Sequence, residues 1–189
     1  MGGHELVRAT RLLLSTALCD PEVTHIALLS ESCVPIRSLS YILASLEASP
    51  KSRFYFSGLD YCSLMQRARA KAVPSVPDSC WRFQPQWWLM SRETALWANA
   101  NDYTKDLELV EIPDEMYFST VLMLQGYPLE DRVHCRPVTW TFWEKGHGSP
   151  KIFKDLDAGI IENMWESGCF FARKFARGAD MSNFRLHRQ

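Results

Sequence analysis

The sequence predicts an α/β fold, in which helices flank a mixed sheet, and three observations support this class. Residues 24–30 form an apolar run between turn-forming residues, which is typical of a strand buried on both faces. Before this run, the apolar side chains of residues 5–19 recur close to a helical period. After it, residues 39–46 predict a second amphipathic helix with Ser38 as its N-cap.

The rest of the chain continues this alternation. We expect further strands at 53–56, 86–91, 138–143 and 169–175, and further helices at 92–99, 113–126 and 156–166. Segment 58–80 is rich in basic residues and proline and has few apolar side chains, so we expect an ordered loop over one face of the sheet. No repeat or linker interrupts the chain, which predicts a single domain over residues 1–189.

The composition argues against several classes of protein. The formal net charge is -1, so the chain lacks the basic excess of a nucleic-acid binder. No apolar run reaches the ~18 residues that a membrane-spanning helix needs, and the N-terminus lacks the apolar core of a signal peptide. The six cysteines include no Cys-x-x-Cys pair and no zinc-like spacing, and they could form three disulfides or stay as buried thiols.

The run Pro113-Asp114-Glu115 stands where a helix is expected to begin. Proline suits the first turn of a helix, and acidic residues suit its positive N-terminal end, so capping alone accounts for both acids. A carboxylate held by a rigid helix at the edge of a sheet could instead act as a general base. These residues by themselves leave both interpretations open.

Two basic residues end the last predicted strand. Alternate side chains of a strand face opposite sides, so Arg173 and Lys174 point apart, or one of them sits at the strand end. A lysine beside a packed aromatic strand can bind phosphate as a point charge. A solvated basic residue near the C-terminus explains Lys174 equally well.

Aromatic side chains are numerous, with seven tryptophans in the chain. Their rings can stack on the apolar face of a sugar, although most tryptophans fill a core. Trp87, Trp88 and Trp143 lie in segments that mix aromatic and polar residues. Packing is the simpler interpretation of Trp87, Trp97 and Trp140.

Other chemical motifs are weak or absent. Asp155-Leu156-Asp157 fits the Asp-x-Asp pattern of metal-dependent glycosyltransferases, but it stands late in the chain, and either aspartate could cap the following helix. The sequence contains no Gly-x-Ser-x-Gly nucleophile elbow and no glycine-rich phosphate loop.

Six groups of residues occur in an order that is hard to obtain by accident. They lie at 9–18, 28–36, 86–92, 113–115, 138–150 and 170–175. The most specific is Leu28-Leu-Ser-Glu-Ser-Cys33-Val-Pro35-Ile. Together they resemble the core-2/I-branching N-acetylglucosaminyltransferase family (glycosyltransferase family 14), with its plant-type branch as the closer match, and the resemblance covers nearly the whole chain.

The resemblance implies a glycosyltransferase-A-type fold and a place among Golgi membrane enzymes that work on the luminal side. Members carry a cytoplasmic tail, a membrane anchor and a first βαβ unit that binds uridine, and all three would lie before Met1. We therefore expect a truncated chain that lacks the first nucleotide-binding βαβ unit. Membrane association would then occur only through a segment absent from this chain.

The family also implies a reaction. Its members move a sugar, N-acetylglucosamine in many cases, from a UDP-sugar donor to a hydroxyl of a glycan or glycoprotein. The transfer inverts the anomeric configuration and uses no metal or other cofactor. The alternative is a catalytically inactive, shortened member that binds glycans or acts as a regulatory module.

The resemblance assigns roles to individual residues. Glu115 corresponds to the catalytic base, and Lys174, with Arg173 as its helper, corresponds to the group that holds the donor diphosphate. Sugar or acceptor contacts are expected from Trp143, Trp87, Trp88, Arg67 and Arg69. The second basic residue of the phosphate site has no clear counterpart, and its candidates are Lys145, His147 and Lys151.

Overall fold

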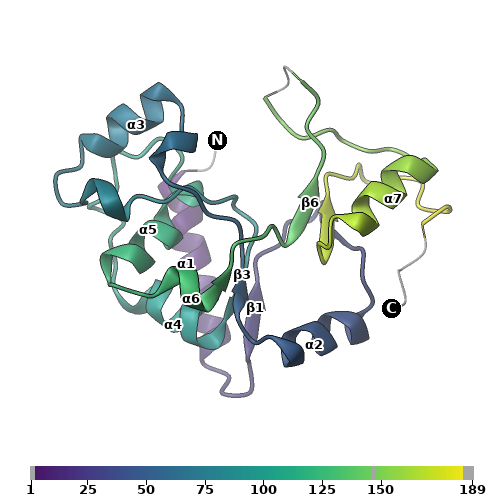
Figure 1. Cartoon of the computed structure of the whole chain (residues 1–189), viewed down its shortest axis with the longest axis horizontal. Coiled ribbons are helices and arrows are strands. Elements are labelled where there is room, and N and C mark those ends of the chain that lie inside the picture. The colour runs from purple at the N-terminus through teal and green to yellow at the C-terminus, as the bar shows by residue number, and fades with distance from the viewer. Residues whose placement is uncertain (1–2, 146–147, 185–189) are drawn as a thin grey trace. The chain divides into compact units, whose positions relative to one another are not determined.

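The computed structural model describes residues 3–145 and 148–184, and its chain path is drawn in Figure 1. The chain forms two compact units, each assembled from two segments of sequence. Unit 1 comprises Met1–Leu28 and Lys51–Arg136, and unit 2 comprises Leu29–Pro50 and Pro137–Gln189. The prediction of one domain over the whole chain stays a prediction.

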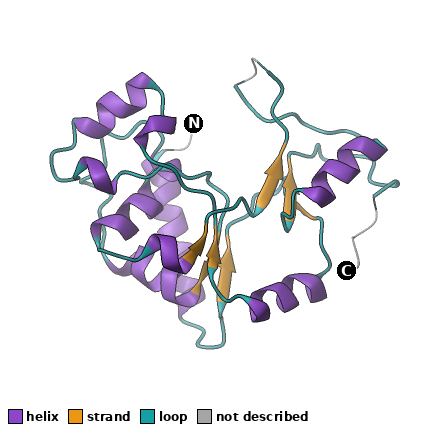
Figure 2. Ribbon diagram, in the orientation of Figure 1, coloured by secondary structure: helices purple, strands orange, loops and turns teal. Residues whose placement is uncertain are grey.

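Unit 1 contains a four-stranded mixed sheet (Figure 2). In order across the sheet its strands are β1 (His25–Ala27), β4 (Leu89–Ser91), β3 (Ser52–Arg53) and β5 (Val133–His134). Strand β4 pairs antiparallel with both β1 and β3, whereas β5 pairs parallel with β3. The predicted α/β class, with helices around a mixed sheet, is therefore confirmed.

The helices of unit 1 are short, and two of them, α3 and α4, begin at side-chain caps. They are α1 (His4–Leu18), α3 (Leu64–Lys71), α4 (Arg92–Ala100), α5 (Tyr117–Leu124) and α6 (Leu129–Arg132), with 3-10 turns η1 (Leu59–Tyr61), η2 (Asp78–Cys80) and η3 (Pro113–Glu115). The Ser91 side chain accepts a hydrogen bond from the Thr94 backbone N–H at the start of α4. Such caps satisfy amide groups that have no partner inside the helix.

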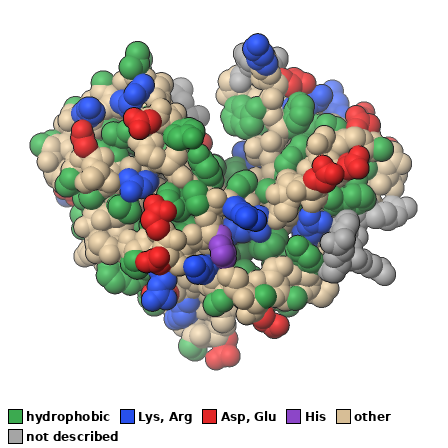
Figure 3. Space-filling view, viewed as in Figure 1, with side chains coloured by type: hydrophobic (Ala, Val, Ile, Leu, Met, Phe, Trp, Pro, Cys, Tyr) green, Lys and Arg blue, Asp and Glu red, His purple; other side chains and the backbone are tan. Residues whose placement is uncertain are grey.

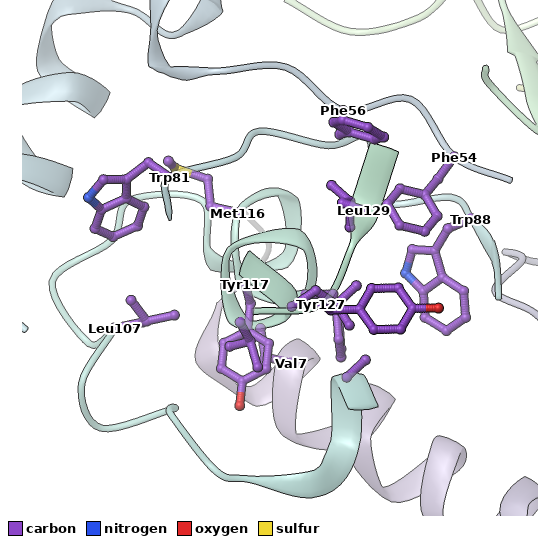
Figure 4. Close-up of a cluster of buried hydrophobic side chains, with 14 of the residues drawn as sticks. Val7, Phe54, Phe56, Trp81, Trp88, Leu107, Met116, Tyr117, Tyr127 and Leu129 are labelled. Atoms are coloured by element: carbon purple, nitrogen blue, oxygen red, sulfur yellow. The ribbon is translucent and has the colours of Figure 1, made fainter. Parts of the chain in front are cut away.

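The core of unit 1 lies between its helices and the sheet, and Figure 4 shows part of it. Trp88 is 1% exposed, and its ring meets the ring of Phe118 edge-on at a centroid distance of 5.7 Å. Beside this core, the Thr94 hydroxyl bonds to the Ser52 hydroxyl at 2.6 Å and to the Tyr127 hydroxyl at 2.7 Å. These buried hydroxyls satisfy one another, and they join β3 to α4.

Unit 2 contains a three-stranded sheet and two helices. Across the sheet the strands are β2 (Val34–Pro35), β7 (Phe171–Arg173) and β6 (Thr139–Thr141), and the helices are α2 (Leu39–Ala48) and α7 (Ala158–Glu166). The central strand β7 is antiparallel to β2 and parallel to β6. Its buried core includes Ile36, Phe153, Met164 and Phe175.

Several local predictions are confirmed. Helices were expected near the observed bounds of α1, α2, α4 and α7. Ser38 caps α2 by accepting a hydrogen bond from the Tyr41 N–H, and Asp157 caps α7 by accepting one from the Ile160 N–H. Strand β7 ends at Arg173, so Lys174 sits at the strand end.

Other local predictions are wrong. Segment 58–80 is not a loop, because it contains η1, η2 and α3, and Ser63 and Gln66 form a reciprocal capping box at the start of α3. Residues 113–126 are not one helix, because Met116 has φ -127° and separates η3 from α5. The first strand spans only His25–Ala27 and is not buried on both faces, because His25 and Ile26 are only half-buried and Ala27 is exposed.

The buried position of Trp88 gives a first testable prediction. Trp88→Ala should lower the free energy of unfolding by about 3–5 kcal/mol, because the core loses a large ring and gains a cavity. Urea denaturation followed by far-UV circular dichroism measures this change. Trp143, which is 56% exposed, provides the control. A Trp88→Ala loss no larger than that of Trp143→Ala would contradict the assignment of Trp88 to the core.

Candidate functional site

Glu115 ends the single turn η3, and its backbone is held by a buried glutamine. The Gln84 N–H donates to the Glu115 carbonyl oxygen at 2.7 Å. The Gln84 side chain is fully buried, and its Oε1 accepts a hydrogen bond from the Ser119 N–H at 2.8 Å. Gln84 therefore fixes both η3 and the beginning of α5. The backbone that carries the Glu115 side chain is thereby held in place.

The carboxyl group of Glu115 has unusual acid–base properties. Burial, and after it the neighbouring charge of Asp114, raise its pKa to about 7. Asp114 is 8% exposed, and burial raises its pKa as well. Its Oδ1 has no hydrogen-bond partner among the described residues. A carboxylate that titrates near neutrality is suited to accept a proton and release it again.

Arg67 on α3 shares its surroundings with Glu115. The buried thiol of Cys62 has a pKa raised by burial, lowered by the charge of Arg67 and raised by the charge of Glu115. Both charges therefore act on the same sulfur. The Arg67 Nε is buried and has no hydrogen-bond partner in the described part of the chain. The structure thus brings Arg67 and Glu115 to one region of unit 1.

Arg69, the second basic residue expected to contact acceptor, is exposed on α3. Residues two apart on a helix point in different directions, so Arg69 does not share the direction of Arg67. Lys71 at the end of the same helix pairs with Asp78 at 3.7 Å.

The predicted sugar-contacting tryptophans differ in position. Trp87 is half-buried in unit 1, directly before the core residue Trp88. Trp88 packs against Phe118, and its 1% exposure leaves no ring face for a sugar, so we assign it to packing. Trp143 is exposed in unit 2, and its indole N–H donates to the Thr141 hydroxyl at 3.2 Å.

Lys174 lines a cavity of about 730 Å³ in unit 2. The lining comprises Glu31, Ser32, Val34, Ile152, Lys174, Phe175, Ala176, Arg177 and Gly178. The Phe175 N–H donates to the Ser32 carbonyl at 3.3 Å, which joins the two sides of this cavity. Two of the groups of residues that carried the family resemblance, 28–36 and 170–175, therefore meet here.

Arg177 adds a second cation to this cavity, and the sequence analysis missed it. The only sequence feature that could have pointed to Arg177 is its position three residues after Lys174 and directly before Gly178. Gly178 has a φ of +76°, a backbone angle that favours glycine. Arg173 is half-buried on β7 and is not among the lining residues. Glu31 contributes an exposed carboxylate, which could accept hydrogen bonds from sugar hydroxyls.

The three expected candidates for a second phosphate-binding residue differ in what they contact. The Lys151 ammonium pairs with Glu144 at 3.1 Å and lies 5.8 Å and 5.7 Å from the ring centres of Phe142 and Phe153. Lys145 is exposed, and His147 lies outside the described residues.

Within 3–145 and 148–184, no group of three or more His, Cys, Asp or Glu side chains is placed to hold a metal ion. Asp157, part of the weak Asp-x-Asp pattern, accepts the capping hydrogen bond of α7. In the same ranges no helix has the length and apolar character needed to cross a bilayer.

Comparison with known proteins identifies the family. The family model described as "Branch: Core-2/I-Branching enzyme" matches residues 1–165. A curated relative, Glycosyltransferase BC10 from Oryza sativa subsp. japonica, is 26% identical over 170 residues, which cover 76% of this chain and 41% of the relative. The chain thus spans about two fifths of the length of the relative it matches. On the match over residues 1–165, this chain belongs to the Core-2/I-Branching enzyme family.

Proposed function

We propose that this chain acts in an inverting glycosyl transfer that needs no metal. The donor is a UDP-sugar, with an N-acetylglucosamine-like sugar, and the acceptor is a hydroxyl of a glycan or glycoprotein. The observation that carries this proposal is the partly buried Glu115 carboxyl group, whose pKa of about 7 suits a general base. Family membership and the relative named as a glycosyltransferase support the same reaction class.

In the proposed step, Glu115 removes the proton of the acceptor hydroxyl. The hydroxyl oxygen attacks the anomeric carbon from the face opposite the diphosphate, so a new C–O bond forms with inversion. The bond from the anomeric carbon to the diphosphate oxygen breaks, and its electron pair leaves with UDP. The proton ends on Glu115, and solvent takes it up afterwards.

The leaving UDP gains negative charge, and cations must stabilise it. Lys174 and Arg177 line one cavity, so their charges support a proposed diphosphate site in unit 2. A lysine acts as a point charge, whereas an arginine can bind two phosphate oxygens through its fork of N–H groups. Together they would supply the positive charge that other glycosyltransferases obtain from a metal ion.

Acceptor contacts are proposed for Arg67, Arg69, Trp87 and Trp143. Arg67 has the strongest support, because it shares the surroundings of Glu115 and has a buried donor without a partner among the described residues. The exposed Trp143 ring can stack on a sugar. The Golgi lumen is the proposed location, because the enzymes that this chain resembles work there.

The first test replaces the proposed base. Glu115→Gln should lower kcat/KM for transfer by about 10²–10⁴-fold, because the amide cannot accept the acceptor proton. UDP release from UDP-N-acetylglucosamine in the presence of an acceptor glycan measures the rate. Glu111→Gln is the control, since Glu111 is an exposed acid four residues earlier. Equal rates for wild type and Glu115→Gln would remove Glu115 from the mechanism, and glycan binding without transfer in both would favour a glycan-binding module.

The second test uses pH. Glu115 is ionised, and therefore basic, only above its raised pKa of about 7, so kcat/KM should fall as the pH drops through 7. Asp114→Asn removes a neighbouring negative charge and should shift this fall to lower pH. The exposed Asp106 serves as the control in Asp106→Asn. A pH–rate profile that is unchanged in Asp114→Asn would show that Asp114 does not set the pKa of Glu115.

The third test addresses the cavity of unit 2. Lys174→Ala and Arg177→Ala should each weaken UDP binding about tenfold, because each removes a charge-assisted contact worth ~1.5 kcal/mol or more. Isothermal titration calorimetry with UDP measures the Kd, and Lys154→Ala at an exposed lysine is the control. A loss in Lys151→Ala but not in Arg177→Ala would assign the second cation to Lys151.

A further inference from the structure

Strands β3 and β5 carry basic residues on one face. They pair in parallel with Arg53 opposite His134. Lys51 directly precedes β3, and side chains two apart along a strand share a face, so Lys51 lies on the side of Arg53. Arg136 lies in the turn after β5, where its N–H donates to the His134 carbonyl at 2.7 Å and its charge acts on the His134 ring. We call Lys51, Arg53, His134 and Arg136 the basic face of unit 1.

The opposite face of the same two strands belongs to the interior. Ser52, Phe54 and Val133 alternate with the basic residues and are 0%, 0% and 4% exposed. Lys51, His134 and Arg136 are exposed, and Arg53 is half-buried. Figure 3 shows a histidine with basic side chains beside it on the visible surface.

The charges of the basic face act on one another. Burial lowers the pKa of His134, and the charges of Lys51, Arg136 and Arg53 lower it further. Neither the Lys51 ammonium nor the Arg136 guanidinium forms an ion pair with a residue that the structure describes. Arg132, two residues before His134, forms an ion pair with Glu93 at 3.3 Å, so its charge is already neutralised.

Like charges gathered on one face repel each other, and a bound anion removes that cost. We propose that the basic face binds an acidic group of an oligosaccharide, namely a sulfate, phosphate or carboxylate. This inference rests on the proposed function, because it names the substrate class of the acceptor. The whole chain has a net charge of -1, so the positive charge of this face is a local feature rather than a general excess.

The position of the basic face relative to Glu115 favours an extended glycan. Ser57 is four residues beyond Arg53, a span of at most roughly 14 Å. The backbones of Ser57 and Phe83 exchange hydrogen bonds of 2.9 Å and 2.8 Å, and the next residue, Gln84, bonds to Glu115. An oligosaccharide of several sugars could therefore present a hydroxyl to Glu115 while its acidic group contacts the basic face.

The experiment measures binding of a fluorescently labelled, heparin-derived hexasaccharide to the full chain. Lys51→Gln combined with Arg136→Gln should weaken its Kd roughly tenfold, because two surface charge contacts of up to ~1 kcal/mol each are lost. Lys105→Gln combined with Lys154→Gln changes the net charge equally at exposed lysines, and its Kd should match wild type. A neutral chitin hexasaccharide should bind both double variants and wild type alike.

Three results would overturn the proposal. One is an unchanged Kd in the Lys51/Arg136 double variant, and another is an equal loss in the Lys105/Lys154 control. The third is equally tight binding of a DNA oligonucleotide of matched charge, because the face would then recognise charge alone. Glu115→Gln should keep wild-type hexasaccharide binding whether or not the chain transfers sugar. A chain without transferase activity would thus refute the proposed function and leave this binding result intact.

Discussion

The hydrogen bonds of Gln84 are the constraint on which the Glu115 site depends. Its N–H holds the Glu115 carbonyl, and its side-chain oxygen holds the first turn of α5 through Ser119. Met116 breaks the helix between these two contacts, so the helix itself does not fix Glu115. Gln84, which is fully buried and bonded to both segments, holds η3 and α5 together in place of a continuous helix. The raised pKa of Glu115 follows, because a rigid backbone keeps its carboxyl group in a partly buried position.

The two units hold different kinds of chemistry. Unit 1 holds a carboxyl group that exchanges protons near neutrality, together with an arginine that shares its surroundings. Unit 2 holds a cavity with two cations and an exposed carboxylate. Burial moves the pKa of a carboxyl group toward neutrality, which suits it to proton transfer, whereas cations in contact with solvent can still bind phosphate. The two environments match these requirements, since Glu115 is partly buried and Arg177 is exposed.

Local signals in the sequence predicted much of the fold, whereas Glu115 and Lys174 were proposed as site residues only from the family resemblance. Ser38 and Asp157 cap helices where their positions indicated, because a cap depends only on the next few residues. The helix α3 was not predicted although local signals for it were present, because its residues are good helix formers and Ser63 and Gln66 form a capping box. The break at Met116 was not predicted either. Arg177 escaped notice because only the fold brings it beside Ser32. Likewise, nothing local distinguishes Trp88, which packs in the core, from its neighbour Trp87.

The sheet of unit 2 has a consequence for how the chain folds during its synthesis. Its central strand, β7, comes last in sequence, whereas its partner β2 is made early, at Val34–Pro35. All of the strands and helices of unit 1 leave the ribosome before β7 does. Residues 29–50 must therefore wait, with the apolar side chains of Ile36 and Ile42 unprotected, while the other unit forms. Such long-range pairing slows folding, and it makes this early segment a natural binding site for chaperones.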